Sequence, residues 1–459
     1  MRIHMNRVRR TTVAALVAGA SLLAVAGCTI KDDLLEPQQP QVISPSDVQN
    51  GTGAVGLYTG ALGWARITLN GGNGNQESAW NFSGLMTDEF KSGDTFAQRN
   101  DADQRVTATN DGVLTPIYNS LQQTRGRARD AIVALTSFAP DEKAKIAEMY
   151  LHMGFAELQL SQMFCNGIPF GETTDGLPES AMPVSNDEGF KLAIARFDTA
   201  LAVLGSSSDP AFVSVRNAVL IAKGRALVDR GQFAAAASTV ATVPTAYQYL
   251  LTFSQTTRDN EWWTMQFSTK RYTVGDSVDA TGVIANALPF ASAKDPRVPV
   301  TLTGKKSFDG STPYNEAQLW GRDDPIAMVA GLDARLIEAE AKLNASDIAG
   351  MLTILNALRA ASLSLGAFKV AAMPALVAPA TQAAAVSLFF REKAFWQFGR
   401  GERLSDLRRL VRQYGRTQEQ VFPSGPFFKN GSYGSGVNFP VPDRELANPN
   451  FTGCADRKA

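Results

Sequence analysis

The chain has 459 residues, of which 44% are hydrophobic and 19% are charged, and its 44 basic side chains balance 44 acidic ones. It is too apolar for a disordered protein and too polar for one that crosses a membrane several times, so a soluble globular protein is expected. The zero net charge and the lack of a lysine or arginine run in the body argue against a nucleic-acid-binding protein.

Histidine is rare, with only His4 and His152 in the chain. His4 lies in a leader segment, so His152 alone would remain in the mature protein. One histidine cannot build a multi-histidine metal site, and it could serve only a single Ser-His-Asp triad. We therefore expect neither a metal nor another cofactor.

Residues 1–27 have the pattern of a secretory signal peptide. An uncharged apolar stretch, residues 13–26, follows a basic segment that contains Arg2, Arg7, Arg9 and Arg10. This stretch is shorter than the roughly 20 residues that a membrane-spanning helix needs. It ends in Val25-Ala26-Gly27-Cys28, which resembles the bacterial lipobox, in which the cysteine is acylated and begins the mature chain. An ordinary signal peptide with an incidental cysteine is the alternative.

Acyl chains on Cys28 would hold the mature protein on a membrane surface, since each buried CH₂ contributes about 0.8 kcal/mol. Removal of residues 1–27 leaves 40 basic side chains against 44 acidic ones. The next run, Thr29-Ile30-Lys31-Asp32-Asp33, resembles the surface-export signal of lipoproteins in Bacteroidetes-type bacteria. Residues 28–50 are polar and contain three prolines, so they are expected to form an extended, lipidated tether.

Cys165 and Cys454 are the two remaining thiols. In an oxidising compartment they could form a disulfide that ties the C-terminal stretch to the helical body. The alternative is two unpaired thiols, one buried and one in a loose tail, and the sequence does not decide between these.

Helical patterns dominate residues 51–459, which we expect to form a single domain. Apolar residues recur at helical spacing in 114–137 and 141–165. Segments 211–243 and 328–361 have the small/large spacing of tetratricopeptide helix pairs, in which glycine and alanine occupy close helix crossings. The predicted fold class is mostly α, with a tetratricopeptide-like helical-repeat scaffold and an irregular, loop- and hairpin-rich half that binds the ligand.

Three segments interrupt the helical pattern. Residues 70–112 are rich in glycine, asparagine and aspartate and are predicted to be a long loop region. Residues 250–325 combine five prolines with short β-type runs and many aromatic residues, and residues 415–459 contain a cluster of glycine, serine and aromatic residues. All three are expected to be irregular insertions.

Several motifs, in order along the chain, resemble those of SusD/RagB-like outer-membrane lipoproteins. Thr87-Asp88-Glu89 and residues 164–169 are similar to the early T-D-E and Y-G-x-V-P elements, and residues 332–341 are similar to an arginine-led Ala-Glu-Ala helix. Residues 391–395 and 401–409 resemble the signature R-E-x-x-F…R-x-x-D-L-R-R, and 439–450 resemble the closing P-I-P-x-x-E-x-x-x-N-P element. Cys165 and the run Phe-Trp-Gln-Phe at 395–398 depart from the usual pattern.

The resemblance implies a solute-binding lipoprotein on the outer membrane, facing the cell exterior. Such a protein would deliver oligosaccharide to a SusC-like TonB-dependent transporter or, in the RagB branch, would deliver peptide. It would break no bond, so no enzyme activity and no catalytic residue are expected. A structural helical-repeat assembly protein and a glycosidase are the alternatives. A glycosidase needs two carboxylates roughly 5–10 Å apart in a cleft, and no local motif indicates such a pair.

Sugar rings pack on flat aromatic faces whose edges carry polar groups, so aromatic residues in loops are the candidates for ligand contact. The candidates are Trp80, Trp262, Trp263 and Tyr272, with Asn260 as a polar neighbour. Because Trp262 and Trp263 are adjacent, at most one of them is expected to face solvent while the other packs inward. Trp320 and Trp396 are expected in the core.

Two groups of charged residues have a plainer explanation than a binding site. The charges of 391–409 are expected to form intramolecular ion pairs and a solvated helix face rather than an anion site. Asp94, Asn100, Asp101 and Asp103 are oxygen ligands close together in a loop, yet they lack the ordered spacing, the glycine and the terminal glutamate of an EF-hand. We expect solvated acids there and no metal.

Overall fold

The structure is a computed structural model that describes residues 49–71, 77–174, 177–178 and 180–459. Cys28, the predicted signal peptide 1–27 and nearly all of the predicted tether lie outside the described residues. Residues Asn50–Ala459 form one compact unit. No helix in the described part of the chain is both long enough and apolar enough to cross a membrane.

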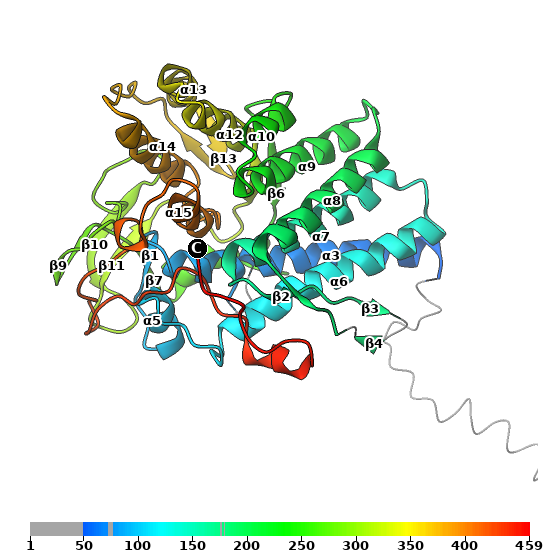
Figure 1. The fold of residues 1–459 in the computed structure, drawn as a ribbon, viewed down its shortest axis with the longest axis horizontal. Coiled ribbons are helices and arrows are strands. Elements are labelled where there is room, and N and C mark those ends of the chain that lie inside the picture. The colour runs from blue at the N-terminus through cyan, green and yellow to red at the C-terminus, as the bar shows by residue number, and fades with distance from the viewer. Residues whose placement is uncertain (1–48, 72–76, 175–176, 179) are drawn as a thin grey trace, which may run out of the picture. The chain divides into compact units, whose positions relative to one another are not determined.

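The scaffold of this unit is a succession of helices in which each packs on the next (Figure 1). These helices are α3 (Gly51–Asn70), α6 (Leu114–Phe138), α7 (Lys143–Met163), α8 (Asn186–Leu204), α9 (Pro210–Asp229), α10 (Phe233–Val240), α12 (Gly331–Asn344) and α13 (Ile348–Ala360). Most of their apolar side chains join one large core, and a smaller core lies among α3, α6 and α7. Neighbour-to-neighbour packing of this kind confirms the predicted tetratricopeptide-like scaffold.

Local sequence signals explain where these helices begin and how closely they approach. At the start of α8, the Ser185 hydroxyl accepts from the Glu188 amide while the Glu188 carboxylate accepts from the Ser185 amide. Pro210 occupies the first turn of α9, where its missing N–H costs nothing. A Cβ on Gly224 would lie 2.6 Å from the Val240 side chain. Glycine is therefore required where α9 crosses α10, as the repeat pattern predicts.

The strands of this unit are short and pair antiparallel in two-stranded sheets. The pairs are β1 (Phe90–Ser92) with β7 (Tyr272–Val274), β2 (Ile168–Pro169) with β5 (Pro183–Val184), β3 (Thr173–Thr174) with β4 (Leu177–Pro178), β6 (Gln248–Leu251) with β12 (Ile326–Ala330), β8 (Val278–Asp279) with β9 (Gly282–Val283), β10 (Val300–Lys306) with β11 (Pro313–Ala317), and β13 (Leu363–Leu365) with β14 (Phe368–Val370). Four of these pairs take at least one strand from residues 248–330, so the hairpins predicted for this region are present. Residues 415–459 contain the short helices η3 (Gln418–Gln420) and η4 (Asp443–Ala447).

The prediction of a long loop over 70–112 is wrong in part. Helices α4 (Ala79–Leu85) and α5 (Ala97–Asp103) form there on either side of β1, and all of α4 is buried. The segment is polar and glycine-rich by composition. Its contacts with α3, α6 and β7 nevertheless bury it, and tertiary packing overrides the local loop signal.

Charged side chains meet in the interior where α14 (Gln382–Trp396) and α15 (Arg403–Arg412) pack on the scaffold. Arg403 donates to both carboxylate oxygens of Asp88, at 2.7 and 2.8 Å, and Lys393 lies 2.6 Å from Asp406. We call this cluster the ionic centre; its members are Asp88, Asp333, Glu340, Lys393, Arg400, Arg403, Asp406 and Arg409, all buried. The predicted ion pairs are present, but the predicted solvated face is wrong, because residues 403–410 are all buried.

The ionic centre joins segments that are far apart in the sequence. Arg409 pairs with Glu340 of α12 and with Asp406 of its own helix, and Arg400 pairs with Asp333. Burial alone would raise the pKa of the Asp333 carboxyl. The ion pair with Arg400 nevertheless holds this pKa below its usual value. The residues of the T-D-E, Ala-Glu-Ala and R-x-x-D-L-R-R motifs are therefore partners of one another.

The C-terminal stretch is fastened at the end of α7. Cys165 and Cys454 form a disulfide there, so the pairing that the sequence left open is present. Next to it, the Arg408 guanidinium donates to the carbonyls of Ser161, Gln162 and Phe164. A cation is favourable at a helix C-terminus, where backbone carbonyls lack intrahelical partners.

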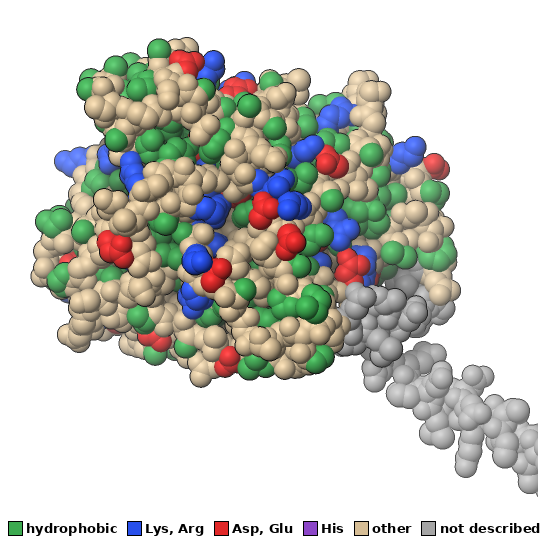
Figure 2. All heavy atoms as spheres, in the orientation of Figure 1, with side chains coloured by type: hydrophobic (Ala, Val, Ile, Leu, Met, Phe, Trp, Pro, Cys, Tyr) green, Lys and Arg blue, Asp and Glu red, His purple; other side chains and the backbone are tan. Residues whose placement is uncertain are grey.

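Charges of both signs remain on the surface of the unit. On the face shown in Figure 2, basic and acidic side chains lie intermixed, and no patch of one sign dominates. This distribution agrees with the equal numbers of basic and acidic residues.

Candidate ligand-binding site

Four of the predicted contact residues lie in the core. Trp80, Trp262, Tyr272 and Asn260 each have 0% of their surface exposed. As direct ligand contacts these predictions are corrected, because no face of these side chains is left for a sugar ring. The predicted burial of Trp396 is confirmed by the same measure.

Trp80 and Trp262 each have a structural partner. The Trp80 indole N–H donates to the Gln159 amide oxygen at 3.1 Å, and a Cβ on Gly401 would lie 2.1 Å from the Trp80 ring. The Trp262 N–H donates to the Gly399 carbonyl at 2.7 Å. The residues that receive these side chains lie far away in the sequence, so a loop tryptophan cannot be assigned to core or surface from its local context.

Asn260 has a capping role rather than a ligand-binding one. Its side-chain oxygen accepts from the Trp262 amide at the start of α11 (Glu261–Trp263), and its amide group donates to the Asp324 carbonyl. It thereby fixes the direction in which α11 leaves the preceding loop.

Trp263 is the predicted residue that reaches the surface, as expected for one member of the adjacent pair. Its ring stacks on Phe267 of η2 (Thr264–Ser268), with centroids 5.8 Å apart, and Phe267 is 54% exposed. The Arg322 guanidinium lies 5.3 Å from the Trp263 ring centroid. Trp263 and Phe267 are four residues apart, so they lie on one side of the same helical segment.

A cavity of about 370 Å³ opens between this segment and the loop that follows β11. Trp320 and Phe368 complete its aromatic lining, and both are half-buried. Trp320 stacks on the buried Trp262 at 5.2 Å, so the prediction that it lies in the core is only half correct. We call this cavity the aromatic pocket; its accessible rings are Trp263, Phe267, Trp320 and Phe368, and the buried Trp262 lies behind Trp320.

Polar groups surround the rings of the aromatic pocket. The Glu316 carboxylate accepts from the Tyr314 hydroxyl at 2.7 Å and from the Gln318 amide at 2.8 Å. The Asp324 carboxylate accepts from the Gly321 amide at 2.7 Å. The side-chain amide nitrogen of Gln266 is buried without a hydrogen-bond partner among the described residues. Flat rings with donors and acceptors at their edges can hold a polyol that has one apolar face.

Glu261, the first residue of α11 and the neighbour of Trp262, carries a buried carboxyl. One of its oxygens has no hydrogen-bond partner in the described part of the chain. Burial, together with the nearby charge of Glu77, raises the pKa of the Glu261 carboxyl to about 8. It is therefore largely protonated at neutral pH, whereas the pKa of Asp333 in the ionic centre is lowered.

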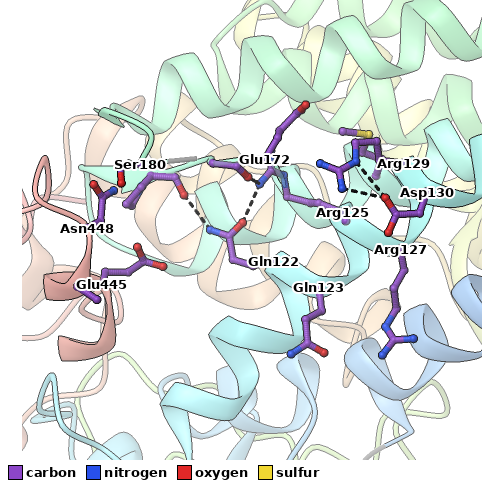
Figure 3. A pocket seen from close by; sticks show the side chains of 15 residues that line it. Gln122, Gln123, Arg125, Arg127, Arg129, Asp130, Glu172, Ser180, Glu445 and Asn448 are labelled. Carbon is purple, nitrogen blue, oxygen red and sulfur yellow. Dashed lines mark hydrogen bonds and ion pairs between the residues drawn. The ribbon is translucent and has the colours of Figure 1, made fainter. Parts of the chain in front are cut away.

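A larger cavity of about 690 Å³ lies between α6 and η4, and most of the residues that line it are polar or charged (Figure 3). Gln122 and Arg125 come from α6, and Glu445 and Asn448 face them from the other side. Arg125 is already bound, since it pairs with Glu157 and donates to the carbonyls of Phe170 and Gly171. None of the described residues that line this cavity is aromatic, so it offers less to a sugar than the aromatic pocket does.

The loop acids near Asp94 are bound to protein donors. Asp94 pairs with Arg99 and with Arg271, and Asp103 accepts from the Ser92 amide at 2.6 Å. The Asn100 side-chain oxygen accepts from Lys429. Within the described residues, no group of three histidine, cysteine or acidic side chains is placed to hold a metal ion.

Phe267 was not predicted as a contact residue, and Trp320 was predicted only as a core residue. The spacing of Trp263 and Phe267 in a polar, loop-rich segment was the available signal for Phe267. No comparable signal marks Trp320 or Phe368, because their places depend on how β11 and β14 approach α11.

Comparisons with known proteins agree on the architecture. No protein-family model matches the sequence, and no curated protein matches it. Solved structures do match. A SusD-like protein from Bacteroides fragilis matches with a TM-score of 0.64 and 10% identity, over 90% of this chain and 98% of that one. A SusD-like carbohydrate binding protein from Bacteroides vulgatus matches with a TM-score of 0.61 and 13% identity, over 88% and 97%.

A SusD homolog from Bacteroides thetaiotaomicron is similar in the same way, with a TM-score of 0.59 and 13% identity over 90% of this chain and 99% of that one. Identities this low establish a shared fold and leave the ligand of this chain open. The motifs along the sequence and the arrangement of the helices thus lead to the same result: this chain has the SusD-like fold.

Proposed function

We propose that this chain is a cell-surface lipoprotein that binds an oligosaccharide in the aromatic pocket and passes it to a SusC-like TonB-dependent transporter in the outer membrane. It binds its ligand without breaking a bond. The observation that carries the proposal is the stacked pair of Trp263 and Phe267 at the mouth of a cavity with a polar rim.

Two further observations support this proposal. One of the solved structures with the same fold is described as a SusD-like carbohydrate binding protein. The lipobox-like run that ends at Cys28 and the Lys-Asp-Asp tract after it fit an acylated protein exported to the outer surface. A transporter as partner follows from the resemblance to SusD/RagB-like lipoproteins.

The carboxylates of the pocket favour binding over hydrolysis. Glu316 already accepts hydrogen bonds from Tyr314 and Gln318 of the chain itself. A glycosidase needs one carboxyl that gives up a proton to the leaving group. In the pocket both Glu316 and Asp324 instead serve as acceptors.

The test is a binding measurement with the full-length chain, purified in detergent, against a panel of oligosaccharides and peptides. We expect saturable binding of at least one oligosaccharide, which Trp263→Ala weakens by about tenfold or more. Phe138→Ala, an exposed ring at the end of α6, is the matched control and should change nothing. Binding of peptides alone would replace the oligosaccharide by a peptide ligand, and glycan binding unaffected by Trp263→Ala would move the site elsewhere.

The lipid anchor has a test of its own. Cys28→Ser should leave the protein unacylated and absent from the outer membrane, as followed by incorporation of a labelled fatty acid and by surface proteolysis of whole cells. If the variant still reached the cell surface in normal amounts, the lipobox assignment would be wrong.

A further inference from the structure

Beside the aromatic pocket, two exposed rings enclose a guanidinium. Phe96 and Phe308 are 49% and 50% exposed. The Arg271 guanidinium lies 5.0 Å from the Phe96 ring centroid and 3.8 Å from that of Phe308. We call these three residues the Phe-Arg-Phe platform. Exposed phenylalanines are ordinary when single, but two held around one cation form a defined surface.

The platform is built by three loops that backbone hydrogen bonds join. The Gly93 amide donates to the Arg271 carbonyl at 2.8 Å, and the Asp309 amide donates to the Gly93 carbonyl at 2.9 Å. The Phe308 amide donates to the Lys270 carbonyl at 3.0 Å. A Cβ on Gly93 would lie 2.3 Å from the Ser307 Cβ, so only glycine allows the loops to approach this closely.

Ion pairs hold the same loops from below. Asp94 accepts from Arg271 at 2.6 Å, and Lys429 lies 2.8 Å from Asp309 while donating to the Asp94 carbonyl at 2.6 Å. Asp94 and Asp309, the acids of these loops, are thus each paired with a cation. Since its geometry is set before any ligand arrives, binding would cost little conformational entropy.

Three lysines of these loops remain uncompensated. Lys305 and Lys306 are exposed at the end of β10, and Lys270 is half-buried over the Tyr314 ring. None of the three forms an ion pair with an acidic side chain in the described part of the chain. The platform therefore combines apolar faces with an excess of positive charge.

The platform lies close to the aromatic pocket along the chain. Phe267 belongs to the pocket and Arg271 to the platform, and four residues of chain span at most about 14 Å. A ligand of several sugar units can therefore contact both. Lysine is depleted in the cores of protein–protein interfaces, so the lysines favour a small anionic ligand over a protein partner.

We propose that the Phe-Arg-Phe platform is a second subsite that selects an acidic oligosaccharide, with Lys270, Lys305 and Lys306 binding its carboxylate or sulfate groups. This inference rests on the proposed function, since it names the class of glycan. The rings of Phe96 and Phe308 pack against sugar faces, and the lysines supply charge that a neutral glycan cannot use.

The test compares acidic probes with neutral partners of the same backbone, using the full-length chain in detergent. One pair is a galacturonate tetramer and its methyl ester, and the other is a sulfated galactose tetramer and its desulfated form. We expect at least one acidic probe to bind about tenfold more tightly than its neutral partner. This preference should shrink as salt is raised, because ions screen exposed charges.

Variants locate the preference. The triple variant Lys270→Gln, Lys305→Gln, Lys306→Gln should reduce binding of the acidic probe to that of the neutral one and leave the neutral probe unchanged. Phe308→Ala should weaken both members of a pair. Lys143→Gln, an exposed lysine at the start of α7, is the control.

Several results would overturn the inference. One is equal binding of the acidic and neutral members in both pairs, and another is an acidic preference that survives the triple variant. Equal binding of the acidic and neutral probes that Trp263→Ala still weakens would refute this inference and leave the proposed function standing. Absence of binding to any glycan would refute both and would leave the platform as a surface for a protein partner.

Discussion

The ionic centre differs from the aromatic pocket and the Phe-Arg-Phe platform in which side chains it buries. Around α15, charges that would prefer water are buried and paired, whereas around Trp263, rings that would prefer the interior are left in solvent. The ionic centre takes partners from α12, α14, α15 and the 87–89 segment. The aromatic rim, meaning the aromatic pocket and the Phe-Arg-Phe platform, is held mainly by loops.

This difference separates what specifies the fold from what serves a ligand. A buried charge is costly unless its partner is in place, so the ionic centre admits only one arrangement of the helices that bring the partners together. An exposed ring contributes little to the stability of the unit, and it can be replaced without harm to the fold. Mutations in the two regions should therefore have separable effects on stability and on binding.

The largest loss of stability is expected from Arg409→Met. This change removes the guanidinium from the buried Glu340 and leaves Asp406 with Lys393 alone, and breaking a buried pair costs about 3–5 kcal/mol. Urea denaturation of the variant and the wild type measures the difference. Arg412→Met, on the same helix but partly exposed, should cost less than about 1 kcal/mol. Equal losses in the two variants would contradict the role given to the ionic centre.

Removal of the disulfide should have the next largest effect. The double variant Cys165→Ser, Cys454→Ser frees the C-terminal stretch from the end of α7, and loss of a native cross-link typically costs about 2–5 kcal/mol. Denaturation of the oxidised and reduced wild type provides the check, because reduction should reproduce the loss. If reduction left the stability unchanged, Arg408 and the packing around it would be the fastening that matters.

The buried carboxyl of Glu261 should make the free energy of unfolding depend on pH. Its pKa in the folded chain is about 8 against 4.5 for the ordinary group, so between these values the folded state binds more protons than the unfolded state. The free energy of unfolding must then fall as pH rises through this window. Glu261→Gln should lessen that fall by about 4 kcal/mol between pH 5 and pH 9, in denaturation curves taken at each pH.

Other buried acids set the background for this measurement. Burial also raises the pKa of Glu89 to about 8 and that of Glu402 to about 7, so the wild type and the variant should both lose stability with rising pH. The comparison is therefore the difference between the two slopes. Identical slopes would mean that Glu261 does not titrate in this range in the folded chain.

The parts of the fold that the sequence predicts are those set by local periodicity. The small/large spacing of 211–243 identified α9 and α10, because Gly224 and Val240 meet in a helix crossing that repeats along the chain. The burial of α4 was missed, because a glycine- and asparagine-rich segment has no periodic apolar pattern, and its cover comes from other parts of the chain.

The candidate site was predicted less well for the same reason. Trp80 and Trp263 both lie in irregular, polar surroundings in the sequence. Whether each is buried depends on Gly401 in one case and on Phe267 in the other. The prediction that at most one of Trp262 and Trp263 faces outward holds, although the two lie in helix α11 and not in the extended chain on which the prediction rested.

The smallest effect on stability is expected at the aromatic rim, from Phe267→Ala. More than half of this ring is already in solvent, so its removal should change the free energy of unfolding by no more than about 0.5 kcal/mol. Oligosaccharide binding should nevertheless fall by about tenfold, since an aromatic stacking contact contributes up to about 1.5 kcal/mol. Urea denaturation and calorimetric titration on the same preparation measure both quantities. A variant that lost stability and binding together would show that the ring supports the pocket from within. The effects on stability and on binding would then not be separable at Phe267.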